Sequence, residues 1–166
     1  MADPFSQVFS GIWQLLLNNT NLTNQVLAGN RIRLDQAPRN PTKEIIRTAD
    51  VPELVLVPTG GVSNLHATSS TTTIQRNYDI LLSTGDLRVN EALFPVQWEI
   101  VVALLDWKLT LGGLAWNGYA GYLSDLNLVN SLEIATDDEN NRNLAGWSTV
   151  LTIETYMNFP TQLLRQ

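Results

Sequence analysis

The sequence predicts an α+β fold: a single domain, residues 1–166, in which a mainly antiparallel β-sheet packs against a long helix and an N-terminal helix. Three observations favour this fold. Apolar residues recur at helical spacing over residues 90–111, and they do so again just after the N-terminus. Residues 72–84 and 146–159 instead alternate apolar and polar side chains, as half-buried strands do. With 44% hydrophobic and 16% charged residues, the chain can build one core of its own.

The apolar segment at residues 90–111 carries two stripes at helical spacing. One stripe consists of Leu93, Val96, Ile100, Leu104, Trp107 and Leu111. The other consists of Phe94, Trp98, Val101, Leu105 and Leu109. A surface helix of a monomer normally has one apolar face, so we expect the sheet to shield one stripe and a second helix or a second subunit to shield the other. Charged residues interrupt the segment too often for a membrane span.

Capping residues and prolines set the other expected helix boundaries. The first helix should begin at Asp3 and Pro4, a capping residue followed by a residue suited to the first turn. A short second helical turn, capped by Thr20 or Asn21, should follow it. Pro95 either kinks the first turn of the long helix or marks a helix that begins near Phe94. Strands are predicted at residues 31–34, 53–57 (ended by Pro58), 72–84, 131–136 and 146–159.

Residues 59–71, TGGVSNLHATSST, are small, polar and uncharged. We expect a projecting loop that becomes ordered only against a neighbouring subunit, because such a composition buries too little surface to fix itself. Together with one apolar stripe, this loop supplies the candidate residues of a subunit interface. These candidates are Phe94, Trp98, Val101, Leu105, Gly60, Gly61, Asn64 and His66.

Charge is distributed unevenly along the chain. Residues 1–83 hold six acidic and six basic side chains, whereas residues 84–166 hold ten acidic and four basic ones and carry the whole net charge of −6. This balance argues against binding nucleic acid through phosphate neutralisation. The mildly basic, proline-containing segment at 35–52 is either a solvated connection or a contact with an acidic partner.

The sequence lacks the signatures of catalysis and of metal or cofactor binding. There is no cysteine, and His66, the single histidine, has no neighbouring acid in the sequence with which to build a catalytic triad. The acidic run at 137–139 lacks the central glycine and closing glutamate of a calcium loop, which favours a solvated hairpin tip. We therefore expect no enzyme, no cofactor and no metal site. The first residues do not form a signal peptide, so synthesis in the cytoplasm is expected.

The order of segments resembles the tail-terminator, or tail-completion, proteins of long-tailed bacteriophages. The resemblance covers most of the chain, apart from residues 114–130. It rests on an opening helix followed by LTNQVLAGNRIRL, a proline-rich connection, PELVLVP, the strand TIQRNYDILLST, a helix over the sheet and the closing strand WSTVLTIETYMNF.

This resemblance implies a non-catalytic α+β subunit that forms a hexameric ring in the virion. Such a ring caps the finished tail tube and provides the surface for head–tail joining, with the tail tube protein and the neck or connector proteins as partners and no membrane involved. DNA passes through its lumen without specific binding. Asp137, Asp138 and Glu139 would then line or rim the lumen, or else keep the outer surface soluble. A lumen lined instead by Arg31, Arg33, Arg39 and Arg47 would indicate that the ring grips DNA.

The sequence is also consistent with two other functions. One is another neck ring, such as a stopper or an adaptor-like connector. The other is a soluble α+β domain that binds a small ligand in an aromatic pocket. The oligomeric state of the purified protein separates the second from the ring-forming functions.

Overall fold

The computed structural model describes residues 3–35, 52–84, 89–116, 119–136 and 146–161. The helices are α1 (Pro4–Asn18), α2 (Thr20–Gln25), the 3-10 turn η1 (Ala28–Asn30), the π-helical turn η3 (Val89–Leu93), α3 (Phe94–Leu105) and α4 (Trp107–Leu111). The strands are β1 (Arg31–Arg33), β2 (Glu53–Ala67), β3 (Thr71–Thr84), β4 (Leu114–Trp116), β5 (Tyr119–Thr136) and β6 (Gly146–Pro160).

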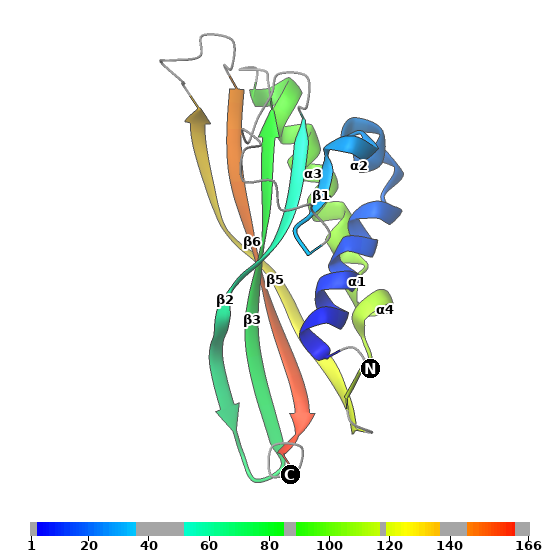
Figure 1. The fold of residues 1–166 in the computed structure, drawn as a ribbon, viewed down its shortest axis with the longest axis vertical. Helices are drawn as coiled ribbons and strands as arrows, with labels where there is room; N and C mark the ends of the chain where they lie inside the picture. Colours follow the sequence, from blue (N-terminus) through cyan, green and yellow to red (C-terminus); the bar gives the residue numbers. More distant parts are fainter. Residues whose placement is uncertain (1–2, 36–51, 85–88, 117–118, 137–145, 162–166) are drawn as a thin grey trace.

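The strands form one twisted six-stranded sheet, and the helices lie on one side of it (Figure 1). The strand order is β1-β2-β3-β6-β5-β4. Among the described strands, only β1 and β2 pair in parallel, and every other neighbouring pair is antiparallel. The predicted α+β fold with a mainly antiparallel sheet is confirmed.

A single core lies between the helices and one face of the sheet. The side chains of β3 and β6 that face the helices are buried: Tyr78, Ile80, Leu82, Leu151, Ile153 and Met157. The helix α1 contributes Val8, Ile12, Leu15 and Leu16 to the same cluster. Asp3 caps α1 as predicted, because its Oδ1 accepts a hydrogen bond from the Ser6 N–H at 3.0 Å. We call the opposite side of the sheet the open face.

The second helix is capped one residue earlier than predicted. Asn19, and not Thr20 or Asn21, accepts a hydrogen bond from the Leu22 N–H through its Oδ1, at 2.9 Å. The Asn19 Nδ2 also donates to the backbone oxygen and the carboxylate of Glu99, both at 3.0 Å. The sequence alone could not show this choice, because the second bonding partner comes from α3.

The predicted strand at 53–57 is too short, and the predicted loop at 59–71 is wrong. β2 continues through Pro58 to Ala67 and pairs with β3 along its length, with register shifts on either side of Val62. Pro58 is tolerated because β1 pairs only with residues 54–56, so within the described residues β2 has no strand on the side away from β3 from there on. The missing N–H of Pro58 therefore costs no ladder bond.

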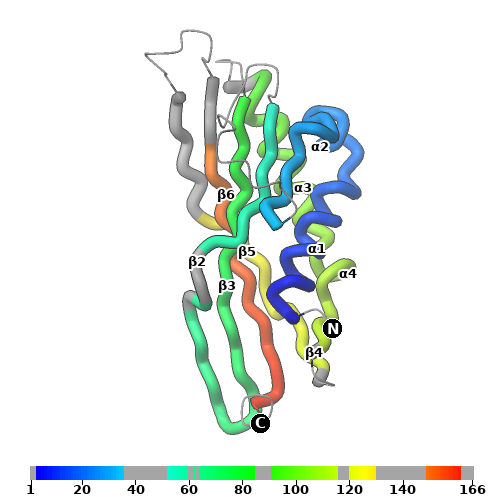
Figure 2. Tube along the Cα trace, in the orientation of Figure 1, coloured from blue at the N-terminus to red at the C-terminus, as the bar shows by residue number. Residues whose placement is uncertain are grey.

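The hairpin formed by residues 59–77, which we call the arm, extends beyond the helices at one end of the molecule (Figure 2). Its turn is closed by Thr68, whose N–H and hydroxyl both donate to the Thr71 carbonyl. The turn is also tied to the residue after β6, since the Thr161 N–H donates to Ser70 and its hydroxyl to Thr68. The expectation that this segment has no order of its own is therefore wrong, because backbone pairing fixes it.

The long apolar segment forms three pieces and not one helix. Pro95 lies in the first turn of α3, so the helix begins near Phe94, one of the two arrangements expected. Asp106 separates α3 from α4, and the latter ends at Gly112.

The strand predicted at 131–136 is the far part of the 18-residue strand β5. Register shifts between Leu123 and Asp125 and between Val129 and Ser131 break the alternation that would have identified it from the sequence.

Candidate interaction surface

The two stripes of the long apolar segment have opposite environments. We call Leu93, Val96, Ile100 and Leu104 the inner stripe, and all four are buried. They belong to the same core cluster as α1 and the sheet, and Leu111 extends this cluster into α4. The prediction that one stripe is shielded within the chain's own fold is confirmed.

The other stripe stays largely uncovered in the single chain. We call Phe94, Trp98, Leu105 and Leu109 the outer stripe; Trp98 is 63% exposed and Leu109 is 89% exposed. Val101, which was predicted with them, is half-buried. Soluble monomeric proteins rarely expose large apolar patches, and where they do, the patch usually marks an interaction site. The partner that covers this stripe stays a prediction.

A surface hollow lies beside Trp98, between α3 and β6. Its volume is about 470 Å³ and its lining is Phe94, Gln97, Trp98, Val101 and Leu151. The lining includes no charged side chain. An exposed tryptophan beside an apolar hollow is the arrangement found at energetically dominant positions of protein interfaces.

The arm carries a second exposed apolar surface. Val62 pairs with Arg76 and Leu65 pairs with Ile74, which places both on the helix side of the sheet, beyond the reach of the helices. Val62 is 47% exposed and Leu65 is 58% exposed. We call these two residues, with the half-buried Ile74, the ledge. The sequence offered no alternating pattern here because the register shifts space Val62 and Leu65 three residues apart.

The predicted interface residues of segment 59–71 lie in the arm and not beside the outer stripe. Asn64 and His66 are exposed, and by their pairing with Gln75 and Thr73 they belong to the open face. Gly60 and Gly61 lie in β2 where its register shifts. Figure 1 shows the arm at one end of the molecule and the beginning of α3 towards the other. Within one chain, the structure does not bring the two halves of the predicted interface together.

The open face of the sheet carries acidic side chains. Asp79, Glu154 and Asp125 lie on β3, β6 and β5, and in the strand register Asp79 and Asp125 are each two residues from Glu154, on either side of it. Each has a neutral partner: the Thr152 hydroxyl donates to Asp79 at 2.8 Å, Asn127 to Asp125 at 3.1 Å, and Tyr156 to Glu154 at 3.1 Å. The hydrogen bond to Glu154 raises the pKa of Tyr156 above its ordinary value.

The arginines of the described strands lie on the opposite side, towards the helices. Arg31 and Arg33 pair with Leu54 and Leu56 of the core face, and Arg76 lies beside Tyr78. The Arg33 guanidinium is 4.8 Å from the centroid of the Phe9 ring and also bridges to Asp35. Within the strands described, the open face therefore carries no Lys or Arg.

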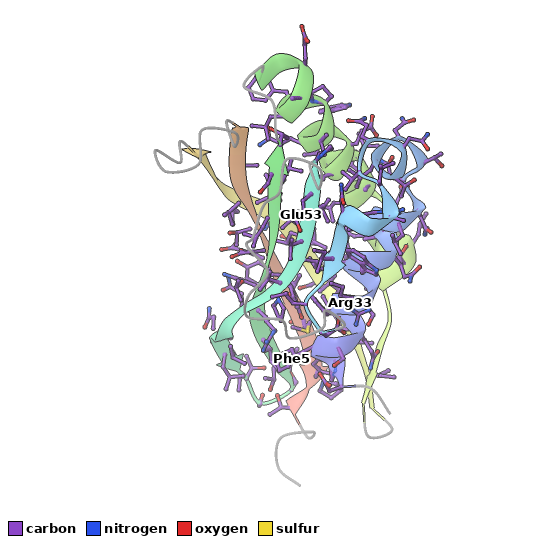
Figure 3. The ribbon with its side chains drawn as sticks, turned by 45° about the horizontal axis from the view of Figure 1, so that its top comes forward. Phe5, Arg33 and Glu53 are labelled. Atoms are coloured by element: carbon purple, nitrogen blue, oxygen red, sulfur yellow. The ribbon has the colours of Figure 1, made fainter. Side chains whose placement is uncertain are left out.

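Figure 3 shows Phe5 at the beginning of α1, Arg33 on β1 and Glu53 at the beginning of β2. The Arg76 guanidinium is 4.7 Å from the centroid of the Phe5 ring, and the backbone oxygen of Phe5 accepts a hydrogen bond from the Tyr78 hydroxyl. Burial raises the pKa of Tyr78 far above its ordinary value, so this hydroxyl stays a donor at any physiological pH. These cation–π contacts give Arg33 and Arg76 roles in packing.

Several predicted residues lie outside the described part of the chain. They are Asp137, Asp138 and Glu139 of the expected lumen, and Arg39 and Arg47 of its basic alternative. Within the described ranges, no group of three or more His, Cys, Asp or Glu side chains is arranged to hold a metal ion. No helix in those ranges is both long enough and apolar enough to cross a membrane.

The fold of the chain has a counterpart in a virion. A chain from the virion of a native gene transfer agent particle superposes with a TM-score of 0.53 and 12% sequence identity. The match covers 90% of this chain and 93% of that one. No protein-family model matches the chain, and no curated protein matches it in sequence. At this identity the similarity establishes a shared fold.

Proposed function

We propose that this chain is a structural virion protein of the phage neck, a ring-forming tail terminator that caps the tail tube and provides the surface for head–tail joining. The observation that carries the proposal is the end-to-end similarity of its fold to a chain of a virion particle. The order of segments in the sequence independently resembles the tail-terminator proteins.

The exposed outer stripe supports an assembled state. Full burial of one large apolar side chain is worth about 1.5–3 kcal/mol, so four such residues left in water favour association. The inner stripe is already buried, and no element in the described part of the chain covers the outer stripe, which leaves it accessible to another molecule. The partner is a second copy in a homo-oligomeric ring, most simply a hexamer. In this role the chain performs no chemistry, and its contacts are with the tail tube protein and the neck or connector proteins.

The charge of the open face suits a channel for DNA. DNA carries one negative charge per about 1.7 Å of its axis, so a basic lining would bind it and an acidic one would let it pass. Asp79, Asp125 and Glu154 lie together on the open face. In the ring this face lines the lumen, and DNA passes without specific binding.

Another neck ring, such as a stopper or an adaptor-like connector, is the alternative, since the same fold and exposed stripe serve any ring. Among the described residues, the hollow beside Trp98, lined by apolar groups and Gln97, is the site considered for a small ligand. That hollow lies at the exposed stripe, which favours a protein partner there.

Native mass spectrometry and electron microscopy of the purified chain test the proposal. We expect closed rings of six subunits that attach to the end of isolated tail tubes and stop further addition of tube protein. A strict monomer at all concentrations would contradict the ring. Rings that bind the head-side connector but never the tube end would favour the other neck component.

A further inference from the structure

Two elements of this chain each lack the partner that their secondary structure requires. A helix stripe and a sheet face that are apolar must be buried against another element. Within the described residues, the outer stripe is a helix surface without a sheet over it, and Val62 and Leu65 of the ledge form a sheet surface without a helix over it. The ledge is therefore the kind of surface that would cover the outer stripe, and the outer stripe is the kind of surface that would cover the ledge.

The two surfaces do not satisfy each other within one chain. Trp98 is 63% exposed and Leu65 is 58% exposed in the same molecule, so neither covers the other. The inner stripe fixes the orientation of α3, because its burial turns the outer stripe away from the core. The arm lies at the end of the molecule away from the beginning of α3 (Figure 1). Only a second molecule can bring the two surfaces together.

We propose that the occupant of the outer stripe is the arm of a second copy of this chain, whose ledge packs against Phe94 and Trp98. Resting on the ring function proposed above, this contact joins two different surfaces of the same chain, and is therefore heterologous. Contacts of this type generate rings when the rotation closes. Each subunit offers its arm to one neighbour and its outer stripe to the other.

The exposed apolar area is of the size that such a contact needs. From their exposed fractions, the four residues of the outer stripe present on the order of 500 Å² and the ledge about 200 Å². A standard interface buries about 1,600 Å² in total, of which about 900 Å² is apolar. The two surfaces therefore supply most of the apolar part, and their polar surroundings supply the rest.

The arm is also preorganised for the contact. It is held in place by its pairing with β3 and by the bonds from Thr161 to the turn, so it loses little freedom on binding. Both surfaces have uncharged centres, and the charged Asp106 and Lys108 lie at the border of the outer stripe.

Two single variants and their mixture test the pairing. Trp98→Asp removes the stripe but keeps the arm, and Leu65→Asp removes the ledge but keeps the stripe. We expect each variant alone to weaken self-association at least about 30-fold in analytical ultracentrifugation, the effect of losing a central interface anchor. Mixed together, they retain one intact arm and one intact stripe, so they should form a 1:1 dimer that grows no further.

Leu27→Asp is the matched control, since Leu27 is 65% exposed but lies in neither surface. We expect it to assemble like the wild type, and an equal loss there would overturn the proposal by attributing the effect to added charge. Circular dichroism of each variant verifies folding, which is expected because all three positions are exposed.

The absence of cysteine allows a second, direct measurement. A chain carrying both Leu65→Cys and Trp98→Cys should give a ladder of disulfide-linked subunits on oxidation, and each single variant should give none. Dimers from a single variant would mean a symmetric contact and would overturn the proposal. Wild-type rings that persist in both Asp variants would overturn the pairing but leave the ring function standing. A wild type that is monomeric at every concentration would overturn both.

Discussion

The inner and outer stripes, most of whose residues lie on α3, have similar apolar side chains but differ in burial. Leu93 and Ile100 of the inner stripe are completely buried, whereas Leu105 of the outer stripe is 70% exposed. Hydrophobicity does not distinguish them, because each stripe would gain about as much free energy from burial. The difference comes from α1 and the sheet, which can cover only one side of the helix. An apolar side chain therefore contributes either to folding or to association, depending on which side of α3 it occupies.

The largest expected difference is between Ile100→Ala and Trp98→Ala. Removing the buried Ile100 side chain should lower the free energy of unfolding by about 2–5 kcal/mol, because it leaves a cavity. Removing the exposed Trp98 side chain should change it by no more than about 0.5 kcal/mol at low protein concentration. Urea denaturation followed by circular dichroism measures both. Equal losses would mean that both stripes serve folding.

A smaller effect is expected where the inner surface continues into α4. A Cβ added at Gly11 would lie 1.8 Å from Leu111 Cδ2 and 2.8 Å from its Cγ, and Leu111 is buried. Gly11→Ala should therefore lower stability by about 1–2 kcal/mol through overpacking, although alanine is the better helix former. Thermal unfolding measures the change. Gly29→Ala is the matched control, since nothing lies within 4 Å of its added Cβ, and a stable Gly11→Ala variant would contradict the close contact.

Glu99 of α3 links this helix to the start of α2 through its hydrogen bonds with Asn19. Asn19→Ala removes the cap of α2 and both bonds to Glu99, so we expect a loss of about 1–2 kcal/mol in chemical denaturation. Asn18→Ala changes an exposed neighbour of the same type and should have little effect. If the two variants were equally stable, the link between α2 and α3 would not contribute to folding.

The smallest effect concerns Asp3, at the start of the helix that backs the inner stripe. Burial alone would raise the pKa of Asp3, but the hydrogen bonds from the Ser6 N–H and hydroxyl outweigh this and lower it. The ionised cap therefore contributes stability above the unfolded pKa of about 3.9, and the contribution disappears as the pH falls through the lower folded pKa. Asp3→Ala should cost about 0.5–1 kcal/mol at pH 7.

A pH series of thermal unfolding measures this difference, which should shrink below about pH 4. Asp3→Asn keeps the acceptor oxygen and lacks the titration, so its stability relative to Asp3→Ala should not change with pH. A difference between wild type and Asp3→Ala that is constant down to pH 2 would contradict the ionised cap.

Much of the fold could be predicted from local patterns. The cap at Asp3, the strand face of Tyr78, Ile80 and Leu82, and the start of α3 at Phe94 all depend on residues adjacent in the sequence. The arm could not be predicted, because its composition is that of a loop and only pairing with β3 makes it a strand. Nor could β5, since its register shifts break the alternation.

The candidate interaction surface was also only partly predictable from the sequence. The two apolar stripes could be predicted from the sequence, because side chains at helical spacing share one face of a helix. The need for a second partner followed, because one core can cover only one of the two stripes. It could not say which stripe faces the core, nor that Val62 and Leu65 form an apolar ledge at the far end of the molecule. The sequence by itself determined which side chains are apolar and how they repeat. Only the tertiary structure decided which of them are covered, because coverage depends on the limited area that α1 and the sheet can bury.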